Sequence, residues 1–353
     1  MNPELNIEVE NVALPYIVYS EYVLFGNERT VHEDDAVSFE QFKQLNKMLI
    51  AQVIAEEDGL QVLPGENEPL IRYVLASEQA KKIARTILKS IRFNELHLLC
   101  FSYFDASHLF VSRKGRSKFY NVQVLSNLPA EEFNQQLRRN YMSAHSIISN
   151  MFSDDIPADI EDLLKLIEKD KARELYHIHG SLVPIGTRSA LFKRLYDYIR
   201  FEIPLDDLRY ILEKLPYVES WKTDIDTNHL LRKTYDHNDS IAYEVPENTE
   251  QGLSREQIVL LGHLGLQPKV DQESLEEDQI KLIKALQFFD YLRNRTTHGL
   301  EPLRDWIKEH NVAFNAEGSE LVSHVRFPLV IPYLQRKLLK KNKLLEAKIK
   351  KFF

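Results

Sequence analysis

Arg293, Asn294 and His298 are the residues whose types and spacing best fit a catalytic site in this sequence. On a helix, Asn294 and His298 are four residues apart and share one face, and Arg293 lies one residue round from Asn294. A histidine can relay protons between a ribose 2′-hydroxyl and a leaving 5′-oxygen, and an arginine can hold the phosphate between them. We therefore expect metal-independent RNA cleavage here, with Asn294 orienting the imidazole or binding a phosphate oxygen.

A helix predicted for residues 274–298 positions this motif. Ser274 and Glu277 have the spacing of a capping box at its start, and Gly299 is typical of a residue just beyond a helix end. Its apolar side chains recur at helical spacing: Leu282, Leu286 and Phe289. Four residues further along lies Arg293, so we expect that arginine at the edge of the buried face.

The segment Arg293-Asn294-Arg295-Thr296-Thr297-His298 resembles the motif of the HEPN superfamily, an arginine followed by Asn, Asp or His and then, four to six residues on, by histidine. The resemblance is limited to the motif and its helix. It implies a helical bundle that forms a homodimer with two motifs facing one another at the interface. It also implies an endoribonuclease that leaves 2′,3′-cyclic phosphate ends and acts as a toxin or antiviral-defence effector.

The Arg-x4-His spacing alone is a weak signal, because it occurs two further times, at 92–97 and 232–237. Only the arginine at 293 is followed by a residue that the family motif uses, Asn294. The alternative interpretation is a plain helix C-terminus, in which Arg293 and His298 bind terminal carbonyl groups.

Arg139, Asn140 and His145 form a looser copy of the motif on a second predicted helix. If it were functional, one chain would contain two facing motifs and would not need to dimerise. The alternative, which we favour, is an amphipathic surface helix, because the sequence around it predicts mixed α and β structure.

Three further features could bind a metal or RNA. His177 and His179 would share one face of a strand, but no third ligand of suitable spacing follows, so we expect ordinary histidines, no metal and no cofactor. Lys114 and Arg116 lie in a basic turn that could contact RNA phosphates or form a solvated hairpin tip. Arg295, inside the motif, is a third expected RNA contact.

The composition limits the classes of protein to consider. The chain has 353 residues with a net charge of −8, 44% hydrophobic and 28% charged residues, which is typical of a folded protein of about two domains. Its one cysteine, Cys100, cannot form an internal disulfide. Since no leader or membrane-spanning segment is evident, we expect a cytoplasmic protein that does not contact a membrane.

Periodicity predicts an α+β N-terminal domain with a mostly antiparallel sheet over 1–152. A mainly α-helical, HEPN-like bundle is expected over 153–318, and a strand with a basic amphipathic helix over 319–353. Within these, the spacing predicts a helix over 37–57 and a strand over 321–331. The last 21 residues contain eight Lys or Arg and one Glu. Three interpretations of the C-terminal helix remain open: docking on the body, RNA contact and membrane-surface binding.

The expected partners are therefore RNA, a second copy of the chain and a regulatory protein. The alternative function is that of a non-catalytic helical subunit that binds a nucleotide or a protein within a larger defence or RNA-processing assembly.

Overall fold

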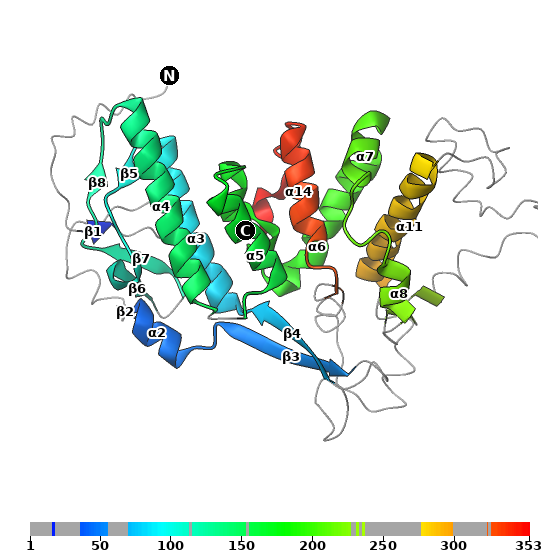
Figure 1. Cartoon of the computed structure of the whole chain (residues 1–353), viewed down its shortest axis with the longest axis horizontal. Helices are drawn as coiled ribbons and strands as arrows, with labels where there is room; N and C mark the ends of the chain where they lie inside the picture. Colours follow the sequence, from blue (N-terminus) through cyan, green and yellow to red (C-terminus); the bar gives the residue numbers. More distant parts are fainter. Residues whose placement is uncertain are drawn as a thin grey trace, which may run out of the picture. The chain divides into compact units, whose positions relative to one another are not determined.

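The computed structural model describes most of the chain (Figure 1). The described residues are 16–17, 36–55, 70–112, 115–152, 155–226, 231–232, 235–236, 277–298, 323 and 326–353. They form two compact units, one from Met1–Ile50 with Val74–Leu182, the other from Ala51–Tyr73 with Val183–Phe353. The first unit thus extends to Leu182, past the expected boundary at residue 152.

Short antiparallel strands form the sheets of the first unit. The largest has the order β1-β7-β6-β2, with β1 at Tyr16–Ile17, β2 at Val37–Ser38, β6 at Leu109–Val111 and β7 at Ser117–Tyr120. A second pair joins β5 (Cys100–Phe101) to β8 (Val124–Leu125). A further two-stranded sheet joins β3 (Leu49–Ala55) to β4 (Leu70–Ala76), and most residues of these two strands belong to the second unit. The expected antiparallel pairing of the first unit is confirmed wherever strand directions are described.

The three longest described helices of the first unit are α3 (Glu78–Leu96), α4 (Ala130–Asn150) and α5 (Ala158–Glu168). Ser77 caps α3, because its hydroxyl accepts a hydrogen bond from the Ala80 N–H. Helix α3 packs against α4 and against the short helices η2 (Arg173–Ile178) and η3 (Gly180–Leu182), and α5 packs against all three of these. This packing explains the late boundary: α5, η2 and η3 complete the core of the first unit.

The second unit is mainly helical. Its described elements are α6 (Ile185–Asp197), η4 (Tyr198–Glu202), α7 (Leu205–Leu212), α8 (Trp221–Asp226), α11 (Glu277–His298), α14 (Val330–Lys340) and η7 (Ile349–Phe352). Helix α11 packs against α6 and α7, and α14 packs against α7. An α+β first part and a helical second part are thus the architecture of the chain.

The helix expected over 37–57 is wrong. Within this range the helix is limited to α2 (Phe39–Leu45), in which Phe39 and Phe42 are buried. Leu45, the next apolar position, is 77% exposed, and Asn46 caps the helix in an extended conformation. The following residues, rich in β-branched and aliphatic side chains, form β3 instead.

The strand expected over 321–331 is also wrong: Ser323 is helical, and helix α14 begins at Val330. Pro332 lies in the first turn of α14, where a missing N–H breaks no helical hydrogen bond. The C-terminal helix ends at Lys340 because Asn342 takes a left-handed conformation (φ 57°). As a result Leu345 lies beyond the end of the helix and is 72% exposed.

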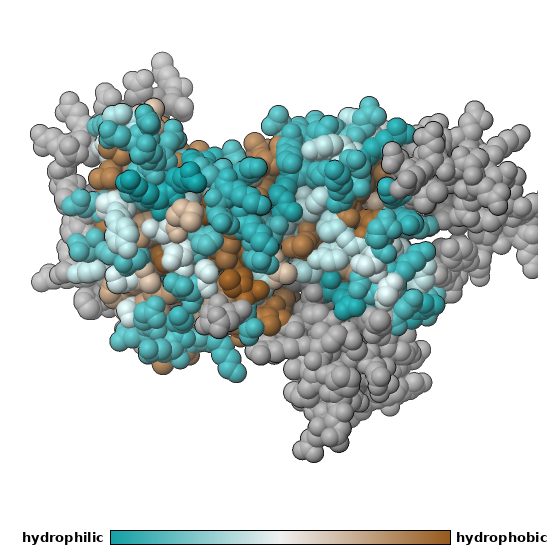
Figure 2. All heavy atoms as spheres, in the orientation of Figure 1, coloured by the Kyte–Doolittle hydropathy of each residue, from teal (hydrophilic) through white to brown (hydrophobic). Residues whose placement is uncertain are grey.

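In the described part of the chain, no helix combines the length and the apolar character that crossing a membrane requires. Hydrophilic side chains cover much of the described surface in the view of Figure 2. A C-terminal helix docked on the second unit, the first of the three interpretations, is what the structure contains.

Candidate functional site

Helix α11 is a core helix of the second unit that carries the motif at its end. Its described buried positions cover a wide face of the helix: Ala285, Leu286, Phe288, Phe289, Tyr291, Leu292 and Arg295. Phe289 packs on Tyr196 of α6 with ring centroids 4.7 Å apart, and Phe288 packs on Trp221 of α8 at 5.6 Å. The motif therefore lies at the end of a helix whose buried face packs against α6 and α8.

Arg293 and Asn294 lie beside this buried face and are partly exposed. Arg293 Nη1 donates a hydrogen bond to Asn294 Oδ1 over 3.1 Å. Thr296 donates to the Arg293 carbonyl over 2.7 Å, which satisfies a backbone acceptor near the end of the helix. The expected position of Arg293 at the edge of the buried face is confirmed, and the structure brings Arg293 and Asn294 together.

His298 lies within α11, four residues after Asn294, so helix geometry puts the two on one face. The side chains of Thr297 and His298 lie outside the described residues, as do Gly299 and the start of the expected capping box, Ser274. The relation of His298 to Arg293 and Asn294 thus comes from the helical backbone and its spacing.

Arg295 corrects one expectation. It is 2% exposed, and its Nε donates to the hydroxyl of Ser323. Burial lowers the pKa of this guanidinium because the charged form loses its water. Tyr291, fully buried beside it, has its pKa raised by desolvation to about 12. In this conformation Arg295 supports the second unit and does not present its guanidinium to RNA, so we remove it from the expected contacts.

The basic turn of the first unit is only partly described. Lys114 lies outside the described residues. Arg116 is half-buried, directly after Gly115, whose positive φ of 72° closes the turn. The Ser112 hydroxyl accepts from the Arg116 N–H over 3.2 Å. The hairpin turn is present, and an RNA contact at Arg116 stays a prediction.

The second motif copy does not form a matching site. Asn140 is 1% exposed: its Oδ1 accepts from the Phe101 N–H and its Nδ2 donates to the Phe101 carbonyl, each over 2.9 Å. Arg139 is exposed, whereas His145 is half-buried and burial lowers its pKa. This copy is a structural feature of α4.

His177 and His179 lie in and just after the short helix η2 and not on a strand. His179 is fully buried between Ser181, whose Oγ is 2.8 Å from Nδ1, and Asp162, whose Oδ2 is 3.1 Å from Nε2. Ser181 is itself fully buried, so no substrate can reach this Ser–His–Asp arrangement. Within the described ranges, no group of three His, Cys, Asp or Glu side chains could hold a metal ion.

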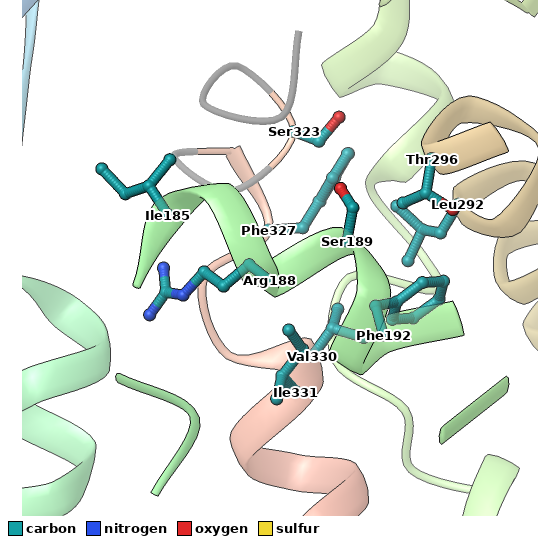
Figure 3. A pocket seen from close by; sticks show the side chains of 10 residues that line it. All are labelled: Ile185, Arg188, Ser189, Phe192, Leu292, Thr296, Ser323, Phe327, Val330 and Ile331. Atoms are coloured by element: carbon teal, nitrogen blue, oxygen red, sulfur yellow. The ribbon is translucent and has the colours of Figure 1, made fainter. Parts of the chain in front are cut away.

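A half-open pocket lies between α6, α11 and the segment leading into α14, a feature that sequence reasoning missed (Figure 3). It contains about 470 Å³ of empty space, counted out to its open mouth. Its walls are mostly apolar, with three hydroxyl groups: Ile185, Arg188, Ser189, Phe192, Leu292, Thr296, Ser323, Phe327, Val330 and Ile331. The guanidinium of Arg188 points away from Phe192 and Leu292. Because its walls come from three distant segments, no local pattern could predict it.

The pocket and the motif use different faces of α11. Leu292 and Thr296 face the pocket. At 3.6 residues per turn, Asn294 and His298 lie roughly 120–160° round the helix from them. The pocket is therefore not part of a site centred on His298.

Comparison of the chain with models of known protein families, with curated proteins and with solved structures finds no match.

Proposed function

We propose that this chain is a metal-independent endoribonuclease whose site is Arg293, Asn294 and His298 on α11. The observation that carries the proposal is the hydrogen-bonded and partly exposed pair of Arg293 and Asn294 at the end of a helix that is otherwise core. An arginine needed only for packing would be buried, as Arg295 is two residues on. The resemblance of the motif to HEPN ribonucleases supports the same assignment.

In the proposed reaction, His298 takes the proton of the ribose 2′-hydroxyl or gives a proton to the leaving 5′-oxygen. The 2′-oxygen attacks the adjacent phosphorus, the bond to the 5′-oxygen breaks, and a 2′,3′-cyclic phosphate remains. Arg293 binds the non-bridging phosphate oxygens, and its charge stabilises the charge that develops on them. Asn294 holds the Arg293 guanidinium through its Oδ1 and shares a helix face with His298.

A dimer with the motif at its interface completes the proposal. One histidine cannot act as base and acid on opposite sides of the same phosphate in one step, so a second His298 from a partner copy supplies the other proton transfer. The partly exposed face with Asn294 leaves room for such a partner. A cytoplasmic location and a role in toxicity or antiviral defence belong to the proposal through the family resemblance alone.

The test is incubation of the purified full-length chain with RNA in EDTA, followed by analysis of the new ends. Cleavage with cyclic phosphate ends supports the proposal. Cleavage that stops in EDTA contradicts it. Cleavage that leaves a 5′-phosphate instead of a 5′-hydroxyl on the downstream fragment also contradicts it.

A second candidate function is favoured by the pocket of Figure 3: a non-catalytic helical subunit that binds a nucleotide. Phe192 and Phe327 offer aromatic surface to a base, and the hydroxyls of Ser189 and Thr296 can donate to or accept from its edge. Saturable nucleoside binding by a chain that does not cleave RNA would favour this function over the first.

A further inference from the structure

The chain after α14 folds back and docks on the second unit. Leu344, Ala347 and Ile349 are buried, at 3%, 0% and 1% exposure. Arg194 of α6 donates through Nε to the Ala347 carbonyl over 3.0 Å, and the Tyr198 hydroxyl donates to Glu346 over 2.8 Å. These contacts join the C-terminal segment to α6 and η4, which are far from it in the sequence, so the segment has a fixed place on the second unit.

Docking leaves a set of lysines pointing outward, Lys348, Lys350 and Lys351, which we call the C-terminal lysine cluster. All three are exposed. Within the described part of the chain, none of them has a carboxylate at ion-pair distance. Two nearby lysines differ, because Lys341 pairs with Asp207 at 2.8 Å and Lys343 with Glu346 at 3.2 Å.

This contrast makes the cluster a place of uncompensated positive charge on an acidic protein with a net charge of −8. Charges of one sign fixed on a docked segment attract a polyanion and lose little conformational entropy of the backbone when it binds. The chemistry fits phosphate groups in a row, as on a nucleic-acid backbone.

A membrane surface is the less favoured polyanion. Amphipathic segments bind membranes through a free apolar face next to the basic one. Here the apolar side chains of the segment are used inside the fold: Leu344, Ala347 and Ile349 are buried, and Leu345 is the large apolar residue of the segment that is exposed. Besides Leu345, the large apolar side chains of the segment that reach the surface are the half-buried Phe352 and Phe353, so exposed charge outweighs exposed apolar area, which favours electrostatic binding of RNA.

We infer that the C-terminal lysine cluster binds the phosphate backbone of single-stranded RNA and holds substrate on the catalytic unit. That the polyanion is RNA rests on the proposed ribonuclease function. Three phosphate contacts on a single strand correspond to a salt-dependence slope of about 2 in log Kd against log salt.

The experiment measures RNA binding without cleavage. Full-length protein with His298→Ala is titrated against a labelled single strand of about 20 nucleotides, with fluorescence anisotropy at salt between about 50 and 200 mM. The test variant adds Lys348→Gln, Lys350→Gln and Lys351→Gln. The matched control adds Lys47→Gln, Lys169→Gln and Lys171→Gln, three exposed lysines of the first unit that change the net charge equally.

The inference predicts that the test triple raises Kd roughly tenfold at the lower salt and reduces the salt slope by about 2, while the control triple changes Kd less than about twofold. Equal effects of the two triples would overturn it. So would cluster-dependent binding to phosphatidylserine vesicles without cluster-dependent binding to RNA. Every binding measurement uses a chain with His298→Ala, so it does not depend on cleavage. A failure of the ribonuclease proposal would instead appear in the separate cleavage assay of the unsubstituted chain.

Discussion

The side-chain amide of Asn140 pairs with the backbone of Phe101 in both directions, accepting from its N–H and donating to its carbonyl over 2.9 Å each. Asn140 in this way acts as one more residue of the β5 edge, delivered from helix α4. Asn294 occupies the same place in the other Arg-Asn-containing motif, yet it is partly exposed and bonded to its neighbour Arg293. Asn140 is therefore a structural residue, whereas Asn294 is a candidate site residue.

Replacing these two asparagines with alanine should therefore have opposite effects. Asn140→Ala leaves the buried N–H of Phe101 without its partner, while the Phe101 carbonyl keeps the donor Gln136 Nε2, so we expect a loss of about 1–3 kcal/mol of unfolding free energy. Asn294→Ala should change stability by less than about 0.5 kcal/mol and should slow RNA cleavage instead. Chemical denaturation and a cleavage assay on both variants measure this. A stable Asn140→Ala chain that has lost cleavage would reverse the assignment.

Structural features that depend on residues close together in the sequence could be predicted from it. Helix α11 carries the motif as expected. Failures arose where distant partners decide: α2 ends at Leu45, which is 77% exposed, and the apolar character of that residue alone could not reveal its exposure. In the same way, the sequence around Arg295 contains no sign of Ser323, which is 28 residues away.

The hydrogen bond from buried Arg295 to Ser323 gives a stability prediction for the second unit. Ser323→Ala removes an acceptor from a buried guanidinium, which should cost about 1.5–3 kcal/mol. Ser189→Ala, at another hydroxyl of the same pocket, is the matched control and should cost less than about 0.5 kcal/mol. Thermal unfolding of both variants tests this. Equal melting temperatures would show that the bond to Ser323 contributes little.

Asp170 gives a pH-dependent prediction for the first unit. Arg173 donates to both of its carboxylate oxygens over 2.6 Å, and these hydrogen bonds lower the pKa of Asp170. A carboxylate with a lowered folded-state pKa stabilises the fold above its unfolded pKa of about 3.9 and loses that contribution as the pH falls through the folded-state value.

We therefore expect Asp170→Asn to cost about 1 kcal/mol at neutral pH and much less near pH 2. Asn is a suitable replacement because Asp170 has a positive φ of 49°, which asparagine tolerates. Urea unfolding at several pH values measures the difference. A destabilisation that is constant with pH would mean that the carboxylate charge is not its cause.

Cys100 offers a chemical reporter of the first unit, because it is the one cysteine of the chain. It is 1% exposed in β5, and burial raises the pKa of its thiol to about 11. At pH 8 only about one thiol in a thousand is then ionised, so alkylation by iodoacetamide should be at least 100-fold slower than for a free thiol. Reaction should become fast on unfolding, which mass spectrometry can follow. Rapid labelling of the native chain would show that β5 opens readily.

The most direct measurement of the central claim is the rate of RNA cleavage by His298→Ala in EDTA, compared with the unsubstituted chain and with His145→Ala. Because His298 is proposed to transfer protons at the scissile phosphate, its loss should slow cleavage by about 100-fold or more. His145→Ala removes the histidine of the structural motif copy and should retain the cleavage rate within about twofold. Cleavage that continues unchanged without His298, or that is lost with His145, would contradict the assignment of the site to α11.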